Sequence, residues 1–442
     1  MLTLMNSEVV LPSRILFGSG VRERLSQVAP PLGQRAWFIF GSRRFHPSYG
    51  TTHASDAPTL WEELSQTLQT VGVESQYLTT ISREPTIDDV DRAVKTLRSH
   101  LRPGDFLIAV GGGAAMDLAK ATAALVVQSV SQSESVGEET FSVRDFLEGI
   151  GTGRKLVQTP LSVIAMPTTA GTGAEATKNA VITSHHPPCK KSLRHPTMLP
   201  KVVVVDPELL ATLPSAILAA SGMDAITQLI ESAISGRANQ FCRSLATAAL
   251  APAMRALPTL FRAATDASNT DSLDKTVTQR LRESREAMAY AALVSGISLA
   301  NSGLGLAHGV AASLGVHAGV SHGVACAMLL PMALRINADV AAETIQQLEQ
   351  SLLTQSTTVA HTGIESLDAY MAANAGAEAK MSLEQRMIAL NRMLRIPATL
   401  SELGVDASQI PEIARDSKGN SLSGNPRPIS ESELIDILTQ ML

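Results

Sequence analysis

The sequence predicts a two-domain protein, with an α/β N-terminal domain built on a mainly parallel sheet and an all-helical C-terminal domain. A chain of 442 residues exceeds the size of one ordinary hydrophobic core. In the first half, strand signals alternate with helices of roughly 10–14 residues, which is typical of βαβ units. After Asp206-Pro207 the strand signal disappears and only helical periods remain. We therefore place the domain boundary there, with residues 1–206 and 207–442 as the two domains.

The first domain is predicted from alternating apolar runs and amphipathic segments. The predicted strands are 14–17, 35–40, 75–81, 106–110, 162–166 and 202–205. The predicted helices are a short one from Val21 and longer ones at 59–72, 87–100 and 114–127. The run FLIAV at 106–110 is short and continuously apolar, which indicates a strand buried on both faces of a parallel sheet. Thr86 precedes an apolar-periodic segment and is predicted to cap its helix.

The second domain shows helical periods only. The predicted helices are 215–235, 241–262, 276–302 and 308–338. Three polar stretches without periodicity, at 46–57, 129–139 and 352–364, are interpreted as solvated surface loops.

Composition excludes several classes of protein. A net charge of −5 and an aromatic content of 3% argue against a nucleic-acid-binding protein. No run of 18 apolar residues predicts a membrane span, and the N-terminus does not resemble a secretory signal. The cysteines are three in number, without a C-x-x-C pair, which predicts buried thiols in a reducing cytoplasm rather than disulfides or a cysteine-built zinc site.

Two glycine-containing loops follow predicted strands. Gly111, Gly112 and Gly113 join a buried strand to an Ala-rich helix, whose N-terminal N–H groups favour a phosphate or pyrophosphate. The second loop, MPTTAGTGAE at 166–175, offers hydroxyl groups and glycine N–H groups. Because ligands of open parallel sheets bind outside the carboxyl ends of the strands, the pair of loops predicts a nucleotide site.

Polar residues also form a candidate metal set in the helical half. Asp224 and Gln228 are four residues apart on one predicted helix, so both side chains share a face. His308 and His322 follow, each before a glycine, and a carboxylate with two imidazoles suits a divalent metal. The stretch of His185, His186 and Cys189 is interpreted as a solvated, Pro-rich loop.

In this order, the motifs resemble the iron-containing (group III) alcohol dehydrogenase family, whose fold is shared with dehydroquinate synthase. The segments that carry the resemblance are PSRILFGSG at 12–20, GGGAAMDLAK, MPTTAGTGAEAT, KVVVVDPELLATLP at 201–214, GMDAITQLIES, LAHG, SHGVACAMLLP and GNPRPIS at 424–430. The resemblance covers almost the whole chain. It implies a Rossmann-like, dinucleotide-binding N-terminal domain and a dehydroquinate synthase-like helical domain that holds a metal.

Site residues carry over position by position. The resemblance places the cofactor pyrophosphate at Gly111, Gly112 and Gly113, and the rest of the cofactor at Asp117, Thr168, Thr169, Thr172 and Lys190. It places the metal, Fe²⁺ or Zn²⁺, at Asp224, His308, His322 and the position of Gln228. The family usually has histidine at this last position. Because a neutral amide oxygen is a poorer ligand than imidazole, we expect weak binding of iron, binding of another ion, or no metal at all.

A second departure concerns the proton relay. Many members carry a histidine four residues after the first metal-binding histidine, and this chain has Ala312 there. His317 lies between the two candidate metal-binding histidines and is the predicted catalytic substitute. The alternative is that the cofactor ribose and water carry the proton.

The end of the second predicted strand bears on the choice of cofactor. Members that prefer NAD often carry an acidic residue there, whereas this chain reads Gly41-Ser42-Arg43-Arg44. Because guanidinium groups can pair with a 2′-phosphate, we expect NADP(H) to be preferred over NAD(H).

The resemblance implies reversible hydride transfer between NAD(P)(H) and a small alcohol or aldehyde, in a cleft between the two domains. A homodimer or higher homo-oligomer in the cytoplasm is expected, with no nucleic-acid or membrane partner. The alternatives are a metal-independent enzyme resembling maleylacetate reductase, a lyase resembling dehydroquinate synthase, and a non-catalytic binding protein.

Overall fold

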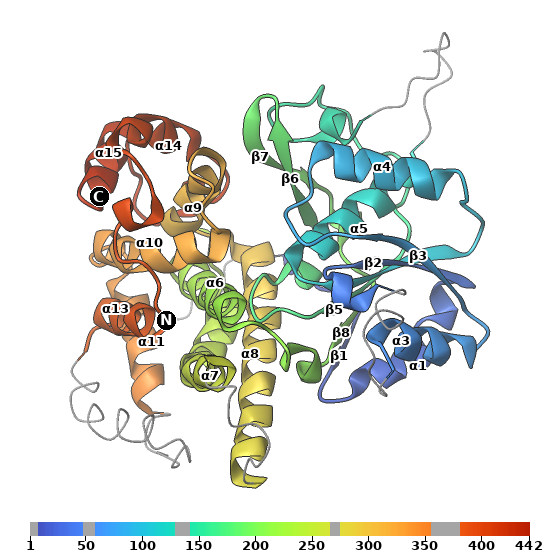
Figure 1. Ribbon diagram of the computed structural model, residues 1–442. Coiled ribbons are helices and arrows are strands. Elements are labelled where there is room, and N and C mark those ends of the chain that lie inside the picture. The colour runs from blue at the N-terminus through green and yellow to red at the C-terminus, as the bar shows by residue number, and fades with distance from the viewer. Residues whose placement is uncertain (1–7, 47–57, 129–141, 266–274, 355–380) are drawn as a thin grey trace. The chain divides into compact units, whose positions relative to one another are not determined.

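The computed structural model describes residues 8–46, 58–128, 142–265, 275–354 and 381–442. The stretches predicted as surface loops fall mostly between these ranges and so lie outside the described residues. The chain divides into two compact units (Figure 1). One unit, here called the α/β unit, comprises Val10–Thr168 and Ala174–Leu209. The other, the helical unit, contains Leu210–Leu442 and the short segment Thr169–Gly173.

The α/β unit is organised around a six-stranded, wholly parallel sheet with the strand order β1-β8-β5-β4-β2-β3. The strands are β1 (Arg14–Phe17), β2 (Arg35–Phe40), β3 (Glu74–Thr80), β4 (Asp105–Gly111), β5 (Val163–Pro167) and β8 (Val202–Val205). The predicted strands are thus confirmed to within a residue or two at each end. The four strands β2, β4, β5 and β8 are buried along their whole length, as continuous apolar runs require.

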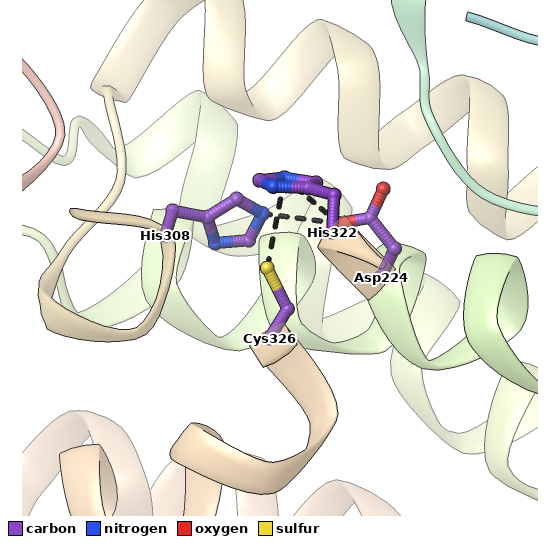
Figure 2. Close-up of side chains that lie close together, drawn as sticks. All are labelled: Asp224, His308, His322 and Cys326. Atoms are coloured by element: carbon purple, nitrogen blue, oxygen red, sulfur yellow. Dashed lines mark hydrogen bonds and ion pairs between the residues drawn. The ribbon is translucent and has the colours of Figure 1, made fainter. Parts of the chain in front are cut away.

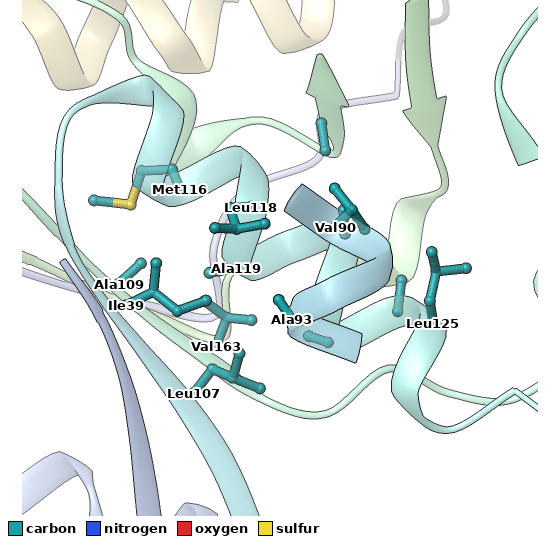
Figure 3. Close-up of a cluster of buried hydrophobic side chains, with 14 of the residues drawn as sticks. Ile39, Val90, Ala93, Leu107, Ala109, Met116, Leu118, Ala119, Leu125 and Val163 are labelled. Atoms are coloured by element: carbon teal, nitrogen blue, oxygen red, sulfur yellow. The ribbon is translucent and has the colours of Figure 1, made fainter. Parts of the chain in front are cut away.

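Helices cover both faces of this sheet (Figure 1). The short η1 (Val21–Arg24), α1 (Leu25–Val28) and η2 (Pro30–Leu32) lie near the first strand, and the longer helices are α3 (Leu60–Gln69), α4 (Ile87–Arg98) and α5 (Gly113–Val126). Successive residues of β4 point to opposite faces, so Phe106 packs on the side of α1 and α3 and Leu107 on the side of α4 and α5. Figure 3 shows the second of these cores, in which side chains from the strands meet those from α4 and α5.

Local sequence explains where these helices begin. Thr86 caps α4 as predicted, because its hydroxyl accepts the N–H of Asp89 at 3.3 Å and the Asp89 carboxylate accepts the N–H of Thr86 at 2.9 Å. The helix α5 begins at Gly113 without a side-chain cap, and its many alanines allow it to be buried on nearly every face.

An antiparallel hairpin was not predicted. The strands β6 (Asn179–His185) and β7 (Pro188–Arg194) pair directly, so the interpretation of residues 185–189 as a loop was wrong except for the turn at His186 and Pro187. His185 and His186 are exposed at the turn, whereas Cys189 is partly buried within the ladder. Buried and partly buried side chains alternate along β6, as in a strand with one face toward the core. The sequence of β7 is mostly polar and shows no such alternation, so the pair was not recognised as a hairpin.

The helical unit is built around α6 (Ser215–Ile234), which is buried on almost all sides by α7, α8 and α10. The other helices are α7 (Gln240–Thr265), α8 (Lys275–Ser302), α9 (Leu306–His317), α10 (His322–Asn337), α11 (Ala342–Thr354), α13 (Leu383–Met393), α14 (Ile410–Asp416) and α15 (Glu431–Thr439). The remaining described elements of the two units are short 3-10 helices. They are η3 (Arg43–Phe45), η4 (Val143–Phe146), η5 (Ala174–Ala176), η6 (Pro196–Met198), η7 (Pro207–Leu210), η9 (Ser401–Leu403), η10 (Ala407–Gln409) and η11 (Leu422–Gly424).

The single helix predicted over 308–338 is two helices. The helix α9 ends at His317, and Gly319 follows with φ of +65°, a left-handed conformation that ends helices. The next helix, α10, begins at His322. The break brings His322 to a helix N-terminus instead of the middle of a long helix.

In the described part of the chain, no single helix has the length and apolar content needed to span a membrane. The consecutive helices α8 and α9 have the required length and apolar content only when they are taken together, and the chain bends by 101° between them.

Candidate active site

Four side chains from three helices converge in the helical unit (Figure 2). Asp224 lies on α6, His308 in the first turn of α9, and His322 and Cys326 in the first turns of α10. Their potential ligand atoms all lie within 4.8 Å of one another. We call these four residues the donor cluster.

The spacing within the donor cluster suits one small cation. Nε2 of His308 lies 3.1 Å from Oδ1 of Asp224, and Nε2 of His322 lies 3.8 Å from the same oxygen. Sγ of Cys326 is 3.6 Å from Nε2 of His322. Ligand atoms around a tetrahedral zinc ion are about 3.3–3.6 Å apart, as bond lengths of 2.0–2.3 Å require. The carboxylate, imidazole and thiol groups present therefore fit a divalent transition metal.

A buried carboxylate outside the cluster sets the orientation of His308. Glu231, about two turns after Asp224 on α6, is 1% exposed and accepts the N–H groups of Gly305, Ala307 and His308 at 3.1, 2.7 and 3.3 Å. It also accepts Nδ1–H of the His308 ring at 2.7 Å. With Nδ1 protonated, Nε2 of His308 is the nitrogen turned toward Asp224 and available to a metal.

In the donor cluster, burial and the neighbouring charged groups shift the pKa values in opposite directions. Burial raises the pKa of the Asp224 carboxyl, but the hydrogen bond from His308 and the charges of both imidazoles reverse this, so that the pKa lies below its ordinary value. Burial lowers the pKa of His308, yet Cys326, Asp224 and Glu231 together raise it well above the ordinary value. Burial raises the pKa of the Cys326 thiol, and the neighbouring imidazoles lower it overall.

Gln228 shares the α6 face with Asp224, as predicted, but its amide group is oriented by other partners. Its Nε2 donates to the backbone carbonyl of Thr172 at 3.4 Å, and its Oε1 accepts from the Ser295 hydroxyl at 2.7 Å. The amide oxygen, which was the predicted ligand atom, is thus turned toward Ser295.

His317 lies at the end of α9 and pairs with carboxylates of α14 and its neighbourhood. Its Nε2 is 2.8 Å from Oδ2 of Asp416, and its Nδ1 is 3.8 Å from Oε2 of Glu412. Nine residues of α-helix separate it from His308, which is about 13 Å along the axis and about half a turn around it. Its predicted proton-carrying role stays a prediction to which this placement adds no support.

In the α/β unit, the predicted pyrophosphate loop follows β4. A Cβ atom on Gly41 would lie 2.8 Å from Cα of Gly111, so the ends of β2 and β4 meet through two glycines. The N–H of Thr168 donates to the carbonyl of Gly111 at 2.9 Å, which joins the end of β5 to the same loop. The uncapped N-terminus of α5 starts at this point. Backbone N–H groups and the helix dipole are what a pyrophosphate uses.

Two predicted cofactor residues have protein partners in this unit. Asp117 accepts the N–H of Val181 at 3.1 Å and forms an ion pair of 3.0 Å with the buried Lys120. Lys190 forms an ion pair of 2.6 Å with Glu84. Asp117 thereby fastens α5 to the β6–β7 hairpin, a structural role that the sequence did not indicate.

The remaining predicted cofactor residues lie in two places. Ser42 caps the turn η3 by accepting the N–H of Arg44 at 3.3 Å, which leaves Arg43 exposed directly after β2. Thr169 and Thr172 belong to the segment Thr169–Gly173, which is part of the helical unit, while Thr168 belongs to the α/β unit. In that segment, the lack of a side chain at Gly171 permits close contact with the Ser221 carbonyl.

Comparison with known proteins decides the family. The sequence model of iron-containing alcohol dehydrogenases matches residues 12–207, and that of the C-terminal region of the Fe-containing alcohol dehydrogenase family matches residues 218–442. The chain belongs to the iron-containing alcohol dehydrogenase family. It is therefore an oxidoreductase that uses NAD(P) and acts on alcohols or aldehydes, and the alternative of a maleylacetate reductase-like enzyme is not favoured.

Individual members of the iron-containing alcohol dehydrogenase family are similar over most of the chain. Lactaldehyde reductase of Escherichia coli is 32% identical over 354 residues, which are 80% of each chain. NADPH-dependent butanol dehydrogenase of Clostridium saccharobutylicum is 25% identical over 96% of this chain and 95% of its own. The crystal structure of a 1,3-propanediol oxidoreductase superposes with a TM-score of 0.76, at 25% identity, over 99% of this chain and 100% of that one.

Sequence reasoning missed two residues of this site. Cys326 was interpreted only as a buried thiol, although it follows His322 by four residues and so shares its helix face. Glu231 follows Asp224 by seven residues, a spacing that also returns to one face of a helix. A search for polar residues at i+4 and i+7 from each predicted ligand finds both.

Proposed function

We propose that this member of the iron-containing alcohol dehydrogenase family is a metal-dependent reductase of small aldehydes, reversible toward the alcohols, with NADP(H) as its preferred coenzyme. The observation that carries the proposal is the convergence of Asp224, His308 and His322 from three helices. A bound divalent cation supplies a Lewis acid for the substrate oxygen. We assign the cation to these three side chains, and the coenzyme to the glycine loop at Gly111–Gly113.

The residues of this chain have three tasks in the proposed reaction. Glu231 holds Nδ1–H of His308, which keeps Nε2 of that ring in place for the cation. The glycines at 41 and 111 let backbone and coenzyme approach closely at the end of the sheet. His322, with a side chain 35% exposed, is the most accessible of the three ligands assigned here, so it marks the open side of the cluster.

The preference for NADP(H) is supported by chemistry at the end of β2. Arg43 is exposed there, and Ser42 stands where a carboxylate would repel a 2′-phosphate. One similar protein is described as an NADPH-dependent butanol dehydrogenase, which agrees with this proposal.

The metal assignment is tested by elemental analysis of purified protein together with turnover of a short-chain aldehyde. We expect Asp224→Ala and His308→Ala to lose both the bound metal and turnover while NADPH binding, followed by its fluorescence, is retained. His185→Ala is the matched control, because His185 is exposed at the end of β6 and belongs to no cluster. Full turnover by the first two variants, with chelator-insensitive activity in the parent, would refute a metal-centred site.

We also propose a homodimer or higher homo-oligomer in the cytoplasm. The family resemblance supports the assembly, and the three cysteines, all free thiols in the structure, suit a reducing compartment. Light scattering on the purified protein measures the mass of the assembly, and a monomeric mass would contradict this part of the proposal.

A further inference from the structure

We propose that Cys326 is the fourth protein ligand of the cation, in the role that the family resemblance gave to Gln228, and that the resulting Asp-His-His-Cys set selects Zn²⁺ over Fe²⁺. The inference rests on the proposed function only for the three ligands Asp224, His308 and His322. The identity of the fourth ligand and the metal preference are separate statements with separate readouts.

The amide of Gln228 is held in one orientation. A backbone carbonyl can only accept hydrogen bonds, so the group facing the Thr172 oxygen at 3.4 Å must be the NH₂ of Gln228. The amide oxygen then accepts from the Ser295 hydroxyl at 2.7 Å. An NH₂ group has no lone pair to offer a metal. Gln228 therefore presents its amide oxygen to Ser295 rather than to the donor cluster, which leaves the fourth ligand position to another residue.

Cys326 is placed in the donor cluster as a ligand would be. It lies one helical turn after His322 on α10, with Sγ 3.6 Å from Nε2 of His322, and the dashed contacts of Figure 2 join it to the cluster. A buried cysteine most often serves as a small apolar side chain. Here the sulfur instead lies within 4.8 Å of a carboxylate oxygen and two imidazole nitrogens, which is a poor environment for an apolar group and a suitable one for a metal ligand.

A second buried cysteine, Cys242, provides a comparison for Cys326. Cys242, on α7 of the same unit, is as fully buried as Cys326 but belongs to no donor cluster in the described residues. Burial is therefore not what distinguishes Cys326. The difference is its position beside His308 and His322.

The sulfur of Cys326 bears on which metal the site prefers. A thiolate is a soft ligand that favours zinc, and zinc also lies above ferrous iron in the general order of affinity for nitrogen, oxygen and sulfur donors. The family's usual fourth ligand is an imidazole, so exchange of that nitrogen for sulfur shifts the preference of the site toward Zn²⁺. We expect the purified protein to retain Zn²⁺ when both ions are supplied at equal concentration under reducing, anaerobic conditions.

The fourth ligand is tested with Co²⁺ alone as a spectroscopic substitute for the native metal. Co²⁺ bound by a thiolate gives a sulfur-to-cobalt charge-transfer band in the near ultraviolet, besides the visible bands that any bound Co²⁺ shows. We expect both sets of bands in the parent protein. Cys326→Ser should lose the charge-transfer band and keep the visible bands, and Cys242→Ser should keep both.

The outcomes separate this inference from the proposed function. Visible cobalt bands without a charge-transfer band in the parent would overturn the role of Cys326 and leave the three-ligand site standing. Absence of any cobalt spectrum in a folded parent would overturn both. Because Cys326→Ser could impair folding, Cys326→Ala is measured in parallel, and NADPH binding reports whether the rest of each variant is intact.

The metal preference has its own test. Removal of an outer hydrogen-bond partner of a ligand costs roughly 10–100-fold in metal affinity, and loss of a direct ligand should cost at least as much. We expect Cys326→Ser to weaken Zn²⁺ binding by that amount and Fe²⁺ binding by less, as measured by competition with a chelator. The double variant Gln228→His with Cys326→Ser should regain affinity and prefer Fe²⁺ more than the parent does. Equal losses for both ions would overturn the claim of selectivity.

Discussion

The carboxylate of Glu231 accepts Nδ1–H of His308 at 2.7 Å, and the same carboxylate accepts the backbone N–H groups that open α9. One buried side chain thus fixes both the start of a helix and the ring at its first turn. A helix N-terminus carries partial positive charge, so a carboxylate there is stabilising without any metal. The same interaction sets the free nitrogen of the imidazole.

This relationship predicts the effect of Glu231→Gln. The amide keeps the shape but loses the charge and places an NH₂ group against backbone N–H groups, so His308 is held less firmly. We expect metal affinity to fall by roughly 10–100-fold while the helical content is retained. Chelator competition measures the first quantity and circular dichroism the second. Glu412→Gln, at an exposed carboxylate beside His317, should leave metal affinity unchanged; a similar loss there would show that the effect is not local.

An ion pair between Arg35 and Asp105 stabilises the α/β unit. They form a bidentate ion pair of 2.7–2.8 Å between β2 and β4, and both side chains are nearly inaccessible. Asp105→Ala leaves a buried guanidinium without its partner, which should cost about 3–5 kcal/mol of unfolding free energy. Urea unfolding followed by tryptophan fluorescence reports on this unit, because Trp37 and Trp61 both lie in it.

The control for this prediction is an exposed ion pair. Lys418 and Glu431 are 2.6 Å apart with side chains 63% and 36% exposed, so Lys418→Ala should cost no more than about 1 kcal/mol.

The Asp105 carboxylate also makes the stability of the α/β unit depend on pH. Burial raises the pKa of Asp105, but Arg35 and the other hydrogen-bond donors lower it overall, so its stabilising contribution is present at neutral pH and is lost only in acid, as pH falls through the lowered pKa. Asp105→Ala should therefore show less acid sensitivity than the parent.

The buried carboxyl group of Glu175 should make the unfolding free energy depend on pH in the opposite direction. Burial raises its pKa to about 7, far above the ordinary value of about 4.3. Between these values the folded chain keeps a proton that the unfolded chain has released, so stability declines as pH rises from about 4.3 to about 7. Glu175→Gln, which is neutral throughout, should gain stability relative to the parent over this range. Thermal unfolding from pH 5 to 8 measures the difference, with exposed Glu23→Gln as control; parallel curves for Glu175→Gln and the parent would contradict it.

The coenzyme preference is tested at the end of β2. Ser42→Asp places a carboxylate where the proposed 2′-phosphate lies, and Arg43→Ala removes its proposed partner. A hydrogen bond to a charged group contributes about 1.5–3 kcal/mol, so each variant should raise the KM for NADPH by at least roughly tenfold with little change for NADH. Lys201→Ala, at an exposed residue before β8, serves as control. A parent that prefers NADH would refute the proposal directly.

The predicted proton-carrying role of His317 is decided by His317→Ala. Its pairing with Asp416 and its place on α9, about 13 Å along the axis from His308, favour a structural role. We expect turnover to fall by less than tenfold with an unchanged pH profile of kcat. If His317 carries the proton, kcat should fall much further, and the alkaline or acidic limb of the profile should disappear.

Much of the fold could be predicted from local pattern. Continuous apolar runs such as residues 106–110 predicted strand bounds close to those observed, because a short apolar segment bounded by turn residues is typical of a strand buried on both faces. The hairpin of β6 and β7 was missed because residues 190–192 are polar, so β7 shows no alternation of apolar and polar side chains. The break between α9 and α10 was missed because the apolar pattern continues through it and only Gly319 marks the end.

The candidate site was predictable in part. Asp224, His308 and His322 were predicted as ligands, and the structure brings them together. The orientation of the Gln228 amide depends on Thr172 and Ser295, which are distant in sequence, so no local pattern could give it. Cys326 was overlooked because cysteines were judged by pairing with other cysteines rather than by their distance from a histidine.

The segment Thr169–Gly173 has a consequence for protein engineering. It belongs to the helical unit although the residues on both sides of it belong to the α/β unit, and Gly173 meets the backbone of Gly296 so closely that a side chain at either position has no room. A chimera made by joining the first half of one family member to the second half of another at a single seam near residue 209 would pair this loop with a foreign α8. Successful exchange therefore requires the loop to travel with the helices it touches.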